Sequence, residues 1–209
     1  MSDDATFWDN RYAATDTVWS ITPNVFVKEF CQSLTPGRAT DIAGGEGRNA
    51  LWLAGRGWEV ENLDFSAVAV EKSLHRAADI NVTDRFHGHV ASISDEPEFV
   101  LAPIDLAVIA YLQVPAADLS RAIAHTATQL RPGGLLFGVW HARENLADGV
   151  GGPQDPAVLP TRDELHAHLS AANLTARDVR LRHREVDGSD RPAIDLVIAA
   201  TAPESIVCG

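Results

Sequence analysis

The most informative segment of this chain is Asp41-Ile42-Ala43-Gly44-Gly45-Glu46-Gly47-Arg48-Asn49. A short apolar segment precedes this stretch and a helical pattern follows it. A glycine-rich turn between a strand and a helix lets a ligand approach the backbone closely and meet the helix N-terminus. Asp64 ends the next apolar segment, about 20 residues further on, where a carboxylate is placed to bind a ribose diol. Together the two features predict a site for a nucleoside-containing cofactor.

Strand and helix patterns alternate along the chain on both sides of this turn. Strands are predicted at 39–43, 58–64, 86–90, 104–110 and 135–140, and helices at 24–34, 47–54, 115–130, after the N-cap Ser66, and from the capping box at 161–164. Two further strands, 174–186 and 193–200, are separated only by a turn at 187–189. Because a short turn forces an antiparallel pair, the pattern predicts an α/β fold whose mostly parallel sheet has one reversed strand.

Composition bounds the class of protein. The chain has 209 residues, with 45% hydrophobic and 22% charged side chains, which suits one globular domain. No apolar run reaches the roughly 18 residues that a membrane span needs. The acidic start Met1-Ser2-Asp3-Asp4 lacks the pattern of a secretory signal, so we expect a cytoplasmic protein. Cys31 and Cys208 are too few for a disulfide framework or a metal site.

The charge balance argues against a polyanionic partner. The formal net charge is -12, and such a field repels nucleic acid unless a basic patch offsets it. The one basic cluster lies at 177–184 and is followed closely by Glu185, Asp187 and Asp190, which is typical of a solvated strand edge. We therefore expect no nucleic acid and no membrane partner, and the sequence leaves the oligomeric state open.

The identity of the cofactor has to be decided between two classes. Gly45-x-Gly47-x-x-Ala50 also satisfies the dinucleotide-binding pattern, and a turn that serves only packing is a third interpretation. Asp41 would repel a pyrophosphate but attract the ammonium and sulfonium of S-adenosylmethionine. The chain also lacks a tyrosine with a lysine four residues later for hydride transfer, and the C-terminal hairpin is foreign to a simple dinucleotide-binding sheet. These observations favour S-adenosylmethionine.

At this point the chain resembles the class I S-adenosylmethionine-dependent methyltransferases, and by motif the tellurite-resistance-type and thiopurine-type small-molecule enzymes. The resemblance covers roughly residues 7–201 and rests on the segments 41–49, 60–66, 104–112 and 130–134, together with Phe7-Trp8-Asp9-Asn10-Arg11-Tyr12 and Trp19. It implies a three-layer sandwich around a seven-stranded Rossmann-like sheet of order 3-2-1-4-5-7-6. It also implies a single methyltransferase domain over 1–209, with an aromatic arm at 1–24 that folds over the cofactor.

The same resemblance implies which residues hold the cofactor. They are Asp41, Ala43, Gly44, Gly45, Gly47, Arg48, Asn49, Asp64, Phe65, Ser66, Ala91, Ser92, Ala110 and Tyr111. Two positions depart from the family pattern. Ala43 stands where the family has its first glycine, and no acid occupies the stretch His89-Val90-Ala91-Ser92, where an aspartate commonly binds adenine. We expect the alanine to be tolerated and Ser92 or a backbone carbonyl to meet the adenine.

Methyl transfer is an in-line displacement in which the protein positions the acceptor and excludes water. Tyr111 is the candidate for an aromatic wall beside the cationic cofactor, and His141 for a general base. We expect the loop 141–160 to choose a small-molecule acceptor, and we expect no metal. A nicotinamide-dependent Rossmann oxidoreductase and a non-catalytic cofactor-binding protein remain the alternatives.

Overall fold

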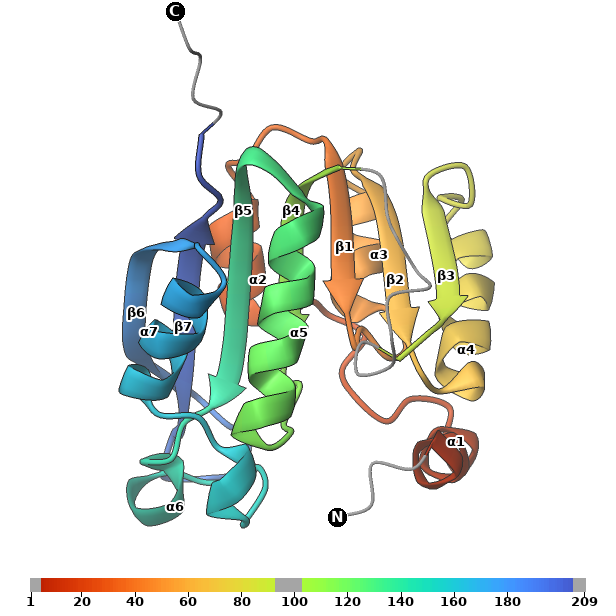
Figure 1. Ribbon diagram of the computed structural model, residues 1–209. Helices are drawn as coiled ribbons and strands as arrows, with labels where there is room; N and C mark the ends of the chain where they lie inside the picture. The colour runs from red at the N-terminus through yellow and green to blue at the C-terminus, as the bar shows by residue number, and fades with distance from the viewer. Residues whose placement is uncertain (1–4, 93–102, 205–209) are drawn as a thin grey trace, which may run out of the picture. The chain divides into compact units, whose positions relative to one another are not determined.

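The computed structural model describes residues 5–92 and 103–204 and divides the chain into two compact units, Met1–Ala110 and Tyr111–Gly209 (Figure 1). The acidic start at 1–4 and Cys208 lie outside the described residues. The strands form a seven-stranded sheet of order β3-β2-β1-β4-β5-β7-β6, which confirms the predicted order. The single-domain assignment stays a prediction.

The first unit alternates strands and helices. Its elements are α1 (Ala5–Ala13), α2 (Val25–Cys31), β1 (Arg38–Ile42), α3 (Arg48–Ala54), β2 (Glu59–Asp64), α4 (Ala67–Asp79), β3 (Phe86–Val90) and β4 (Ile104–Ala110). The helix α1 lies in the arm, where the sequence predicted aromatic character but no helix. The buried run of β4 is confirmed, because Leu106 to Ile109 are all excluded from solvent.

Side chains and one glycine fix where the helices of this unit begin. The Oδ1 atom of Asn24 accepts hydrogen bonds from two backbone N–H groups in the first turn of α2, at 2.9 and 3.2 Å. The hydroxyl of Ser66 accepts one from Ala69 N in α4, at 3.2 Å, so the predicted cap is confirmed. Gly47 precedes α3 with φ of 79°, a conformation that a glycine adopts without strain.

Parallel pairing brings the carboxyl ends of four strands to one edge of the first unit. Ile42 on β1 is in register with Leu63 on β2 and with Ile109 on β4, and Asp64 is in register with Val90 on β3. The glycine turn that follows β1, the end of β2 and the end of β3 are therefore neighbours. This edge is where ligands bind in open α/β sheets.

The second unit ends in the predicted hairpin. Its elements are α5 (Ala116–Gln129), β5 (Leu130–His141), α6 (Asn145–Asp148), the 3-10 helix η1 (Pro156–Val158), α7 (Arg162–Ala171), β6 (Thr175–Arg184) and β7 (Ala193–Thr201). The strand β7 runs antiparallel to both β5 and β6, which confirms the reversed strand. Every residue of β7 is buried, whereas β6 alternates between exposed and half-buried residues, as an edge strand does.

Three local predictions in this unit have different outcomes. The capping box at Thr161 and Glu164 is present at the start of α7. The strand β5 begins at Leu130, five residues before the predicted start at 135, although pairing with β7 starts only at Leu135. The long loop predicted at 141–160 holds two short helices, α6 and η1.

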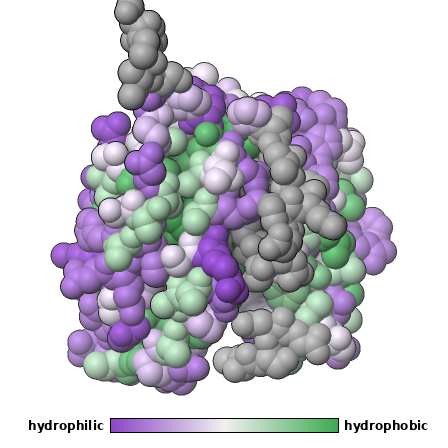
Figure 2. All heavy atoms as spheres, in the orientation of Figure 1, coloured by the Kyte–Doolittle hydropathy of each residue, from purple (hydrophilic) through white to green (hydrophobic). Residues whose placement is uncertain are grey.

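The surface is mixed and the described helices are short. Hydrophilic and hydrophobic residues lie side by side on the face drawn in Figure 2. None of the helices within 5–92 and 103–204 combines the length and the apolar character that crossing a membrane requires.

Candidate functional site

Asp64 fastens the glycine turn to the end of β2. Its Oδ2 atom accepts a hydrogen bond from Gly45 N at 2.8 Å, and its Oδ1 atom accepts one from Ser66 N at 2.9 Å. Only 6% of Asp64 is exposed, and burial raises the pKa of its carboxyl group although both hydrogen bonds oppose the shift. Ala91 N donates to the carbonyl of Asp64 at 3.0 Å, so the end of β3 joins the same group.

Asp41 lies beneath the turn and is fully buried. Its Oδ2 atom accepts a hydrogen bond from Ala50 N at 3.1 Å, in the first turn of α3, where the N-cap Gly47 has no side chain to offer. Burial raises the pKa of the Asp41 carboxyl group to about 7. Its Oδ1 atom has no hydrogen-bond partner in the described part of the chain. A buried carboxylate oxygen without a donor fits a site that receives a cation.

The backbone of the turn adopts left-handed conformations. Ala43 has φ of 54°, Gly45 of 55° and Gly47 of 79°. The predicted tolerance of Ala43 in place of glycine thus concerns backbone strain as well as space, because a left-handed alanine costs roughly 1–2 kcal/mol. Gly44 has a different constraint, since a Cβ atom there would collide with Oδ1 of Asn62 and lie 3.0 Å from Cγ of Asp41.

The aromatic arm packs onto this turn. A Cβ atom on Gly45 would lie 2.6 Å from the hydroxyl oxygen of Tyr12, so only a glycine lets the tyrosine ring come this close. Tyr12 is 4% exposed, its oxygen accepts a hydrogen bond from Trp19 Nε1 at 3.2 Å, and burial raises its pKa far above the usual range. The Trp8 ring centroid lies 5.8 Å from that of Tyr12 and 6.4 Å from that of Trp19. The arm residues therefore form a connected aromatic cluster.

Glu46, inside the glycine turn, anchors the arm. Its Oε2 atom accepts hydrogen bonds from Val18 N at 3.0 Å and Trp19 N at 3.4 Å, while Oε1 lies 3.4 Å from both Lys72 Nζ and Arg76 Nη2 of α4. Glu46 is 3% exposed. Sequence reasoning missed this anchor. Its one signal is an acid within a glycine motif, together with two cations four residues apart on α4, the second helix after the motif.

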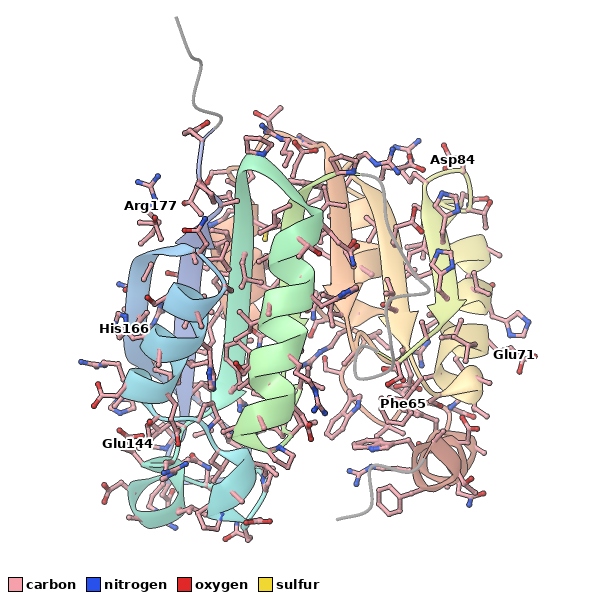
Figure 3. All side chains as sticks on the ribbon, viewed as in Figure 1. Phe65, Glu71, Asp84, Glu144, His166 and Arg177 are labelled. Carbon is pink, nitrogen blue, oxygen red and sulfur yellow. The ribbon has the colours of Figure 1, made fainter. Side chains whose placement is uncertain are left out.

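A second contact joins the arm to α4. The Oδ1 atom of Asp9 accepts hydrogen bonds from Ser66 Oγ at 2.6 Å and from Val68 N at 3.2 Å. Asp9 therefore extends the capping of α4 that Ser66 begins, and it was not predicted. Figure 3 shows Phe65 between the end of β2 and α1.

The remaining predicted cofactor residues also border the turn and the strand ends. Asn49 is buried, and its Oδ1 atom accepts a hydrogen bond from Asn24 N at 2.9 Å, so its side chain supports the start of α2. Arg48 begins α3, Ser92 follows Ala91 and is half-buried, and Ala110 ends β4, next to the pair Ile42–Ile109. Apart from Tyr111, the predicted cofactor residues thus lie within the first unit.

Tyr111 and His141 meet around a residue that the sequence analysis did not select. Within the second unit, the fully buried Asp195 accepts a hydrogen bond from the Tyr111 hydroxyl at 3.0 Å and one from Arg184 Nε at 2.8 Å. Nδ1 of His141 lies 3.2 Å from Oδ1 of Asp195, an ion-pair distance, although the two atoms are not aligned as a hydrogen bond. Burial raises the pKa of Asp195, but the contacts with His141 and Arg184 outweigh it and leave the pKa below its usual value.

The surroundings of His141 hold the ring in place. Its ring centroid lies 5.0 Å from that of Tyr111, which has φ of 60°, a strained conformation for an aromatic residue. His141 N donates to Gln113 Oε1 at 2.8 Å. A Cβ atom on Gly152 would lie 2.7 Å from ring atoms of His141, so the segment 141–160 packs on this ring. A histidine whose Nδ1 faces a buried carboxylate keeps Nε2 for proton transfer.

The described residues contain no group of three His, Cys, Asp or Glu side chains arranged to hold a metal ion. His87 and His89 instead pair with acids across the strands. Nε2 of His87 lies 2.8 Å from Glu59 Oε1, and Nε2 of His89 lies 2.5 Å from Glu61 Oε2.

The strand order, the glycine turn and the acid at the end of β2 define a Rossmann-like protein that binds a nucleoside cofactor at its strand ends. Residues 39–134, a little under half of the chain, match the family described as "Methyltransferase domain". The matched segment contains the glycine turn and the end of β2, and the strand order is that of the class I S-adenosylmethionine-dependent methyltransferases. The match favours S-adenosylmethionine over a nicotinamide cofactor.

Curated relatives overlap with part of the chain. Hemagglutinin 1 of Eikenella corrodens is 30% identical over 111 residues, which are 52% of this chain and 35% of the relative. The tRNA 5-carboxymethoxyuridine methyltransferase of Escherichia coli (strain K12) is 29% identical over 99 residues, 47% of this chain and 38% of the relative. The chain thus spans well under half the length of these relatives.

Solved structures share the fold over most of the chain. TehB from Haemophilus influenzae superposes with a TM-score of 0.71 at 15% identity, covering 93% of this chain and 66% of TehB. The geranyl diphosphate C-methyltransferase of Streptomyces coelicolor A3(2), solved with Mg2+, geranyl diphosphate and S-adenosyl-L-homocysteine, has a TM-score of 0.66 at 15% identity and covers 84% of this chain and 79% of that one. At such identities the superpositions establish the fold alone.

Proposed function

We propose that this protein transfers a methyl group from S-adenosylmethionine to a small-molecule acceptor. The observation that carries the proposal is the Asp64 carboxylate, held by Gly45 N at 2.8 Å and Ser66 N at 2.9 Å. Each oxygen accepts one backbone hydrogen bond and keeps a further lone pair, so the group can accept from both hydroxyls of a ribose. The bonds to the turn fix its direction before the cofactor arrives.

The residues beneath the turn fit the amino-acid end of this cofactor. Asp41 offers a buried oxygen without a donor, and the missing side chain of Gly44 lets Asp41 and Asn62 pack directly beneath the turn. S-adenosylmethionine, when bound, supplies an electrophilic methyl group and its leaving group. The chain then has to bind, orient and exclude water, and such positioning can lower a barrier by up to ~7–11 kcal/mol in the best cases.

The arm is the part of the first unit suited to water exclusion. Tyr12 packs on Gly45, and Glu46 holds the following residues through two backbone hydrogen bonds. The ring faces of Tyr12, Trp8 and Trp19 can stabilise a cation by about 0.5–2 kcal/mol each. We assign the arm to covering the bound cofactor.

Tyr111 and His141 are our candidates for handling the acceptor. Asp195 orients both side chains in the second unit, at 3.0 Å from the Tyr111 hydroxyl and 3.2 Å from His141 Nδ1. An acceptor with an O–H or N–H group loses a proton on methylation, and Nε2 of His141 is suited to take it. The segment 141–160, which packs on this ring, is the proposed determinant of acceptor choice.

The state of the basic cluster on β6 supports a small acceptor over a nucleic acid. Arg177 Nε donates to Thr201 Oγ1 at 2.8 Å, Arg180 Nε lies 2.9 Å from Asp178, and Arg184 is paired with Asp195. Because these arginines already have partners within the protein and the net charge is -12, contacts with the phosphates of a nucleic acid would be weak. The tRNA methyltransferase relative makes a nucleic acid the second candidate acceptor.

Calorimetry followed by a turnover assay tests the proposal. We expect heat on titration with S-adenosylmethionine and none with NADH, and the reverse result would overturn the assignment. The protein is then incubated with S-adenosylmethionine and a panel of small thiols, phenols, amines and carboxylic acids, with total tRNA as a separate arm. S-adenosylhomocysteine formed only with tRNA would reject the small acceptor, and cofactor binding without turnover on any acceptor would favour a non-catalytic binding protein.

A further inference from the structure

Two side chains beneath the glycine turn, on the neighbouring strands β1 and β2, each have a buried oxygen atom without a hydrogen-bond donor. Asp41 on β1 and Asn62 on β2 occupy paired positions in the parallel register, and both are fully buried. Neither Oδ1 atom has a hydrogen-bond partner in the described part of the chain. The two side chains meet beside Gly44, because a Cβ atom on this glycine would contact both Asn62 Oδ1 and Asp41 Cγ.

The orientation of Asn62 is fixed by its other contacts. Its Nδ2 atom donates to the carbonyl of Gly45 at 3.2 Å and to Ser73 Oγ at 3.4 Å, so its oxygen has to face the Asp41 side. A buried acceptor without a donor destabilises the folded protein. A protonated Asp41 carboxyl group would supply the missing donor, since a neutral carboxyl group carries one O–H. Burial, which raises the pKa of Asp41 to about 7, supports the presence of this proton near neutral pH.

The charged and titratable groups around Asp41 come from three elements. Arg48 of α3 lowers the pKa of Asp41, whereas Asp64 at the end of β2 raises it. Cys31 of α2 is a buried thiol whose own pKa is raised to about 12 by burial and by Asp41, so it stays neutral. The backbone N–H of Ala50 and the amide of Asn49 favour the charged form, but burial exceeds them. A further positive charge at the turn would shift the balance to the carboxylate.

We propose that Asp41 and Asn62 share one proton in the ligand-free protein and that binding of the cofactor's cationic amino-acid end at Gly44 expels this proton. The inference rests on the proposed function and adds a regulation of the same site. The O–H bond of Asp41 breaks, the proton passes to solvent, and the carboxylate that remains faces the ammonium and sulfonium charges. Asn62 is the positioning residue, because its oxygen holds the proton on Asp41 while no cation is present.

Proton release is measured by titrating S-adenosylmethionine in two buffers of different ionisation enthalpy. With a pKa near 7 before binding and an ordinary carboxyl pKa after it, about 0.9 proton is released at pH 6 and about 0.5 at pH 7. The experiment stays at or below pH 7, where the ligand's own amino group keeps its charge. Between pH 6 and pH 7, affinity should rise about fivefold.

Two comparisons isolate the source and the trigger of the proton. Asp41→Asn should bind the cofactor with the same heat in both buffers, and Asn62→Ala should release less proton at pH 7. With wild-type protein, 5′-methylthioadenosine is the matched ligand, because it keeps the nucleoside but lacks the ammonium and sulfonium groups. It should release no proton even if the variants fail to fold.

The outcomes separate this inference from the proposed function. No binding of S-adenosylmethionine to the wild-type protein would reject both. Binding with equal heats in the two buffers, or equal proton release by 5′-methylthioadenosine or by Asp41→Asn, would overturn the proton coupling and leave the cofactor assignment standing. A 13C chemical-shift titration of the Asp41 carboxyl group gives an independent reading in the ligand-free protein, where a midpoint near 4 would also overturn it.

Discussion

Replacing Glu46 by alanine should release the aromatic arm while leaving the rest of the first unit folded. Glu46 accepts from two backbone N–H groups of the arm and faces two cations of α4. One hydrogen bond to a charged group contributes about 1.5–3 kcal/mol. The second N–H contact is long, at 3.4 Å, and Lys72 and Arg76 keep other partners in the arm, such as the carbonyls of Thr15 and Asp16.

The substitution therefore removes the equivalent of one hydrogen bond to a charged group. We expect the arm of Glu46→Ala to open about tenfold to a hundredfold more often than that of the wild-type protein. Hydrogen exchange of the amides at 12–20, followed by mass spectrometry, measures this opening directly. Glu71→Ala is the matched control, since it removes the same charge from an exposed position on α4 that Figure 3 shows facing away from the sheet. Unchanged exchange in Glu46→Ala, or equal acceleration across β1 and β2, would refute the anchoring role.

Three further substitutions test the site. Asp64→Ala should weaken S-adenosylmethionine binding by about 1.5–3 kcal/mol in calorimetry, whereas the exposed Asp79→Ala should not, and equal affinities would reject the ribose role. Ala43→Gly should raise the free energy of unfolding by about 0.5–1 kcal/mol in urea, because relief of left-handed strain exceeds the entropy cost of glycine; a loss of stability, as expected for Ala39→Gly, would contradict this. Asp195→Asn should lower stability at pH 7 by about 1.5–3 kcal/mol, and because the folded pKa of Asp195 is depressed, the difference should begin to shrink as the pH falls below about 4 and should vanish only below the folded pKa; thermal melts in which the difference does not shrink at all below pH 4 would show that packing, not charge, is responsible.

The order of strands and helices could be predicted from the sequence, because the periodicity of apolar residues that indicates each element lies within a short segment. The strands β3 and β4 have the predicted bounds, and the reversed strand followed from a turn too short for a crossover. The errors occurred where the backbone is irregular. Pro132 and the glycines beside it are typical of a turn, so the predicted strand starts only at 135, yet β5 begins at Leu130, with Gly133 at φ of 73°. A local turn signal does not reveal whether the flanking chain stays extended.

The candidate site was predictable only where one motif contains it. Asp41, Gly45 and Asp64 stand at spacings that a known fold makes recognisable. Asp9, in contrast, reaches Ser66 across 57 residues, and Arg184 meets Asp195 only through the pairing of β6 with β7. Asp195 had a usable signal, because it is the one charged residue in the apolar run 193–200, and a lone buried charge needs partners. Its partners could not be read from the sequence, since they depend on the pairing of β5, β6 and β7.

Buried acids around the glycine turn bear on the choice between a cationic and an anionic cofactor. Asp41 and Asp64 have no cation within salt-bridge distance in the described part of the chain, and the raised pKa of each shows that the charged form lacks compensation. Glu46 differs, because Lys72 and Arg76 both lie 3.4 Å from it. A pyrophosphate at this turn would add two negative charges beside two uncompensated carboxyl groups, and a sulfonium nucleoside would add positive ones. Raising the pH from 6 to 7 should consequently strengthen binding of the cation, a slope that a turn serving only backbone packing would not produce.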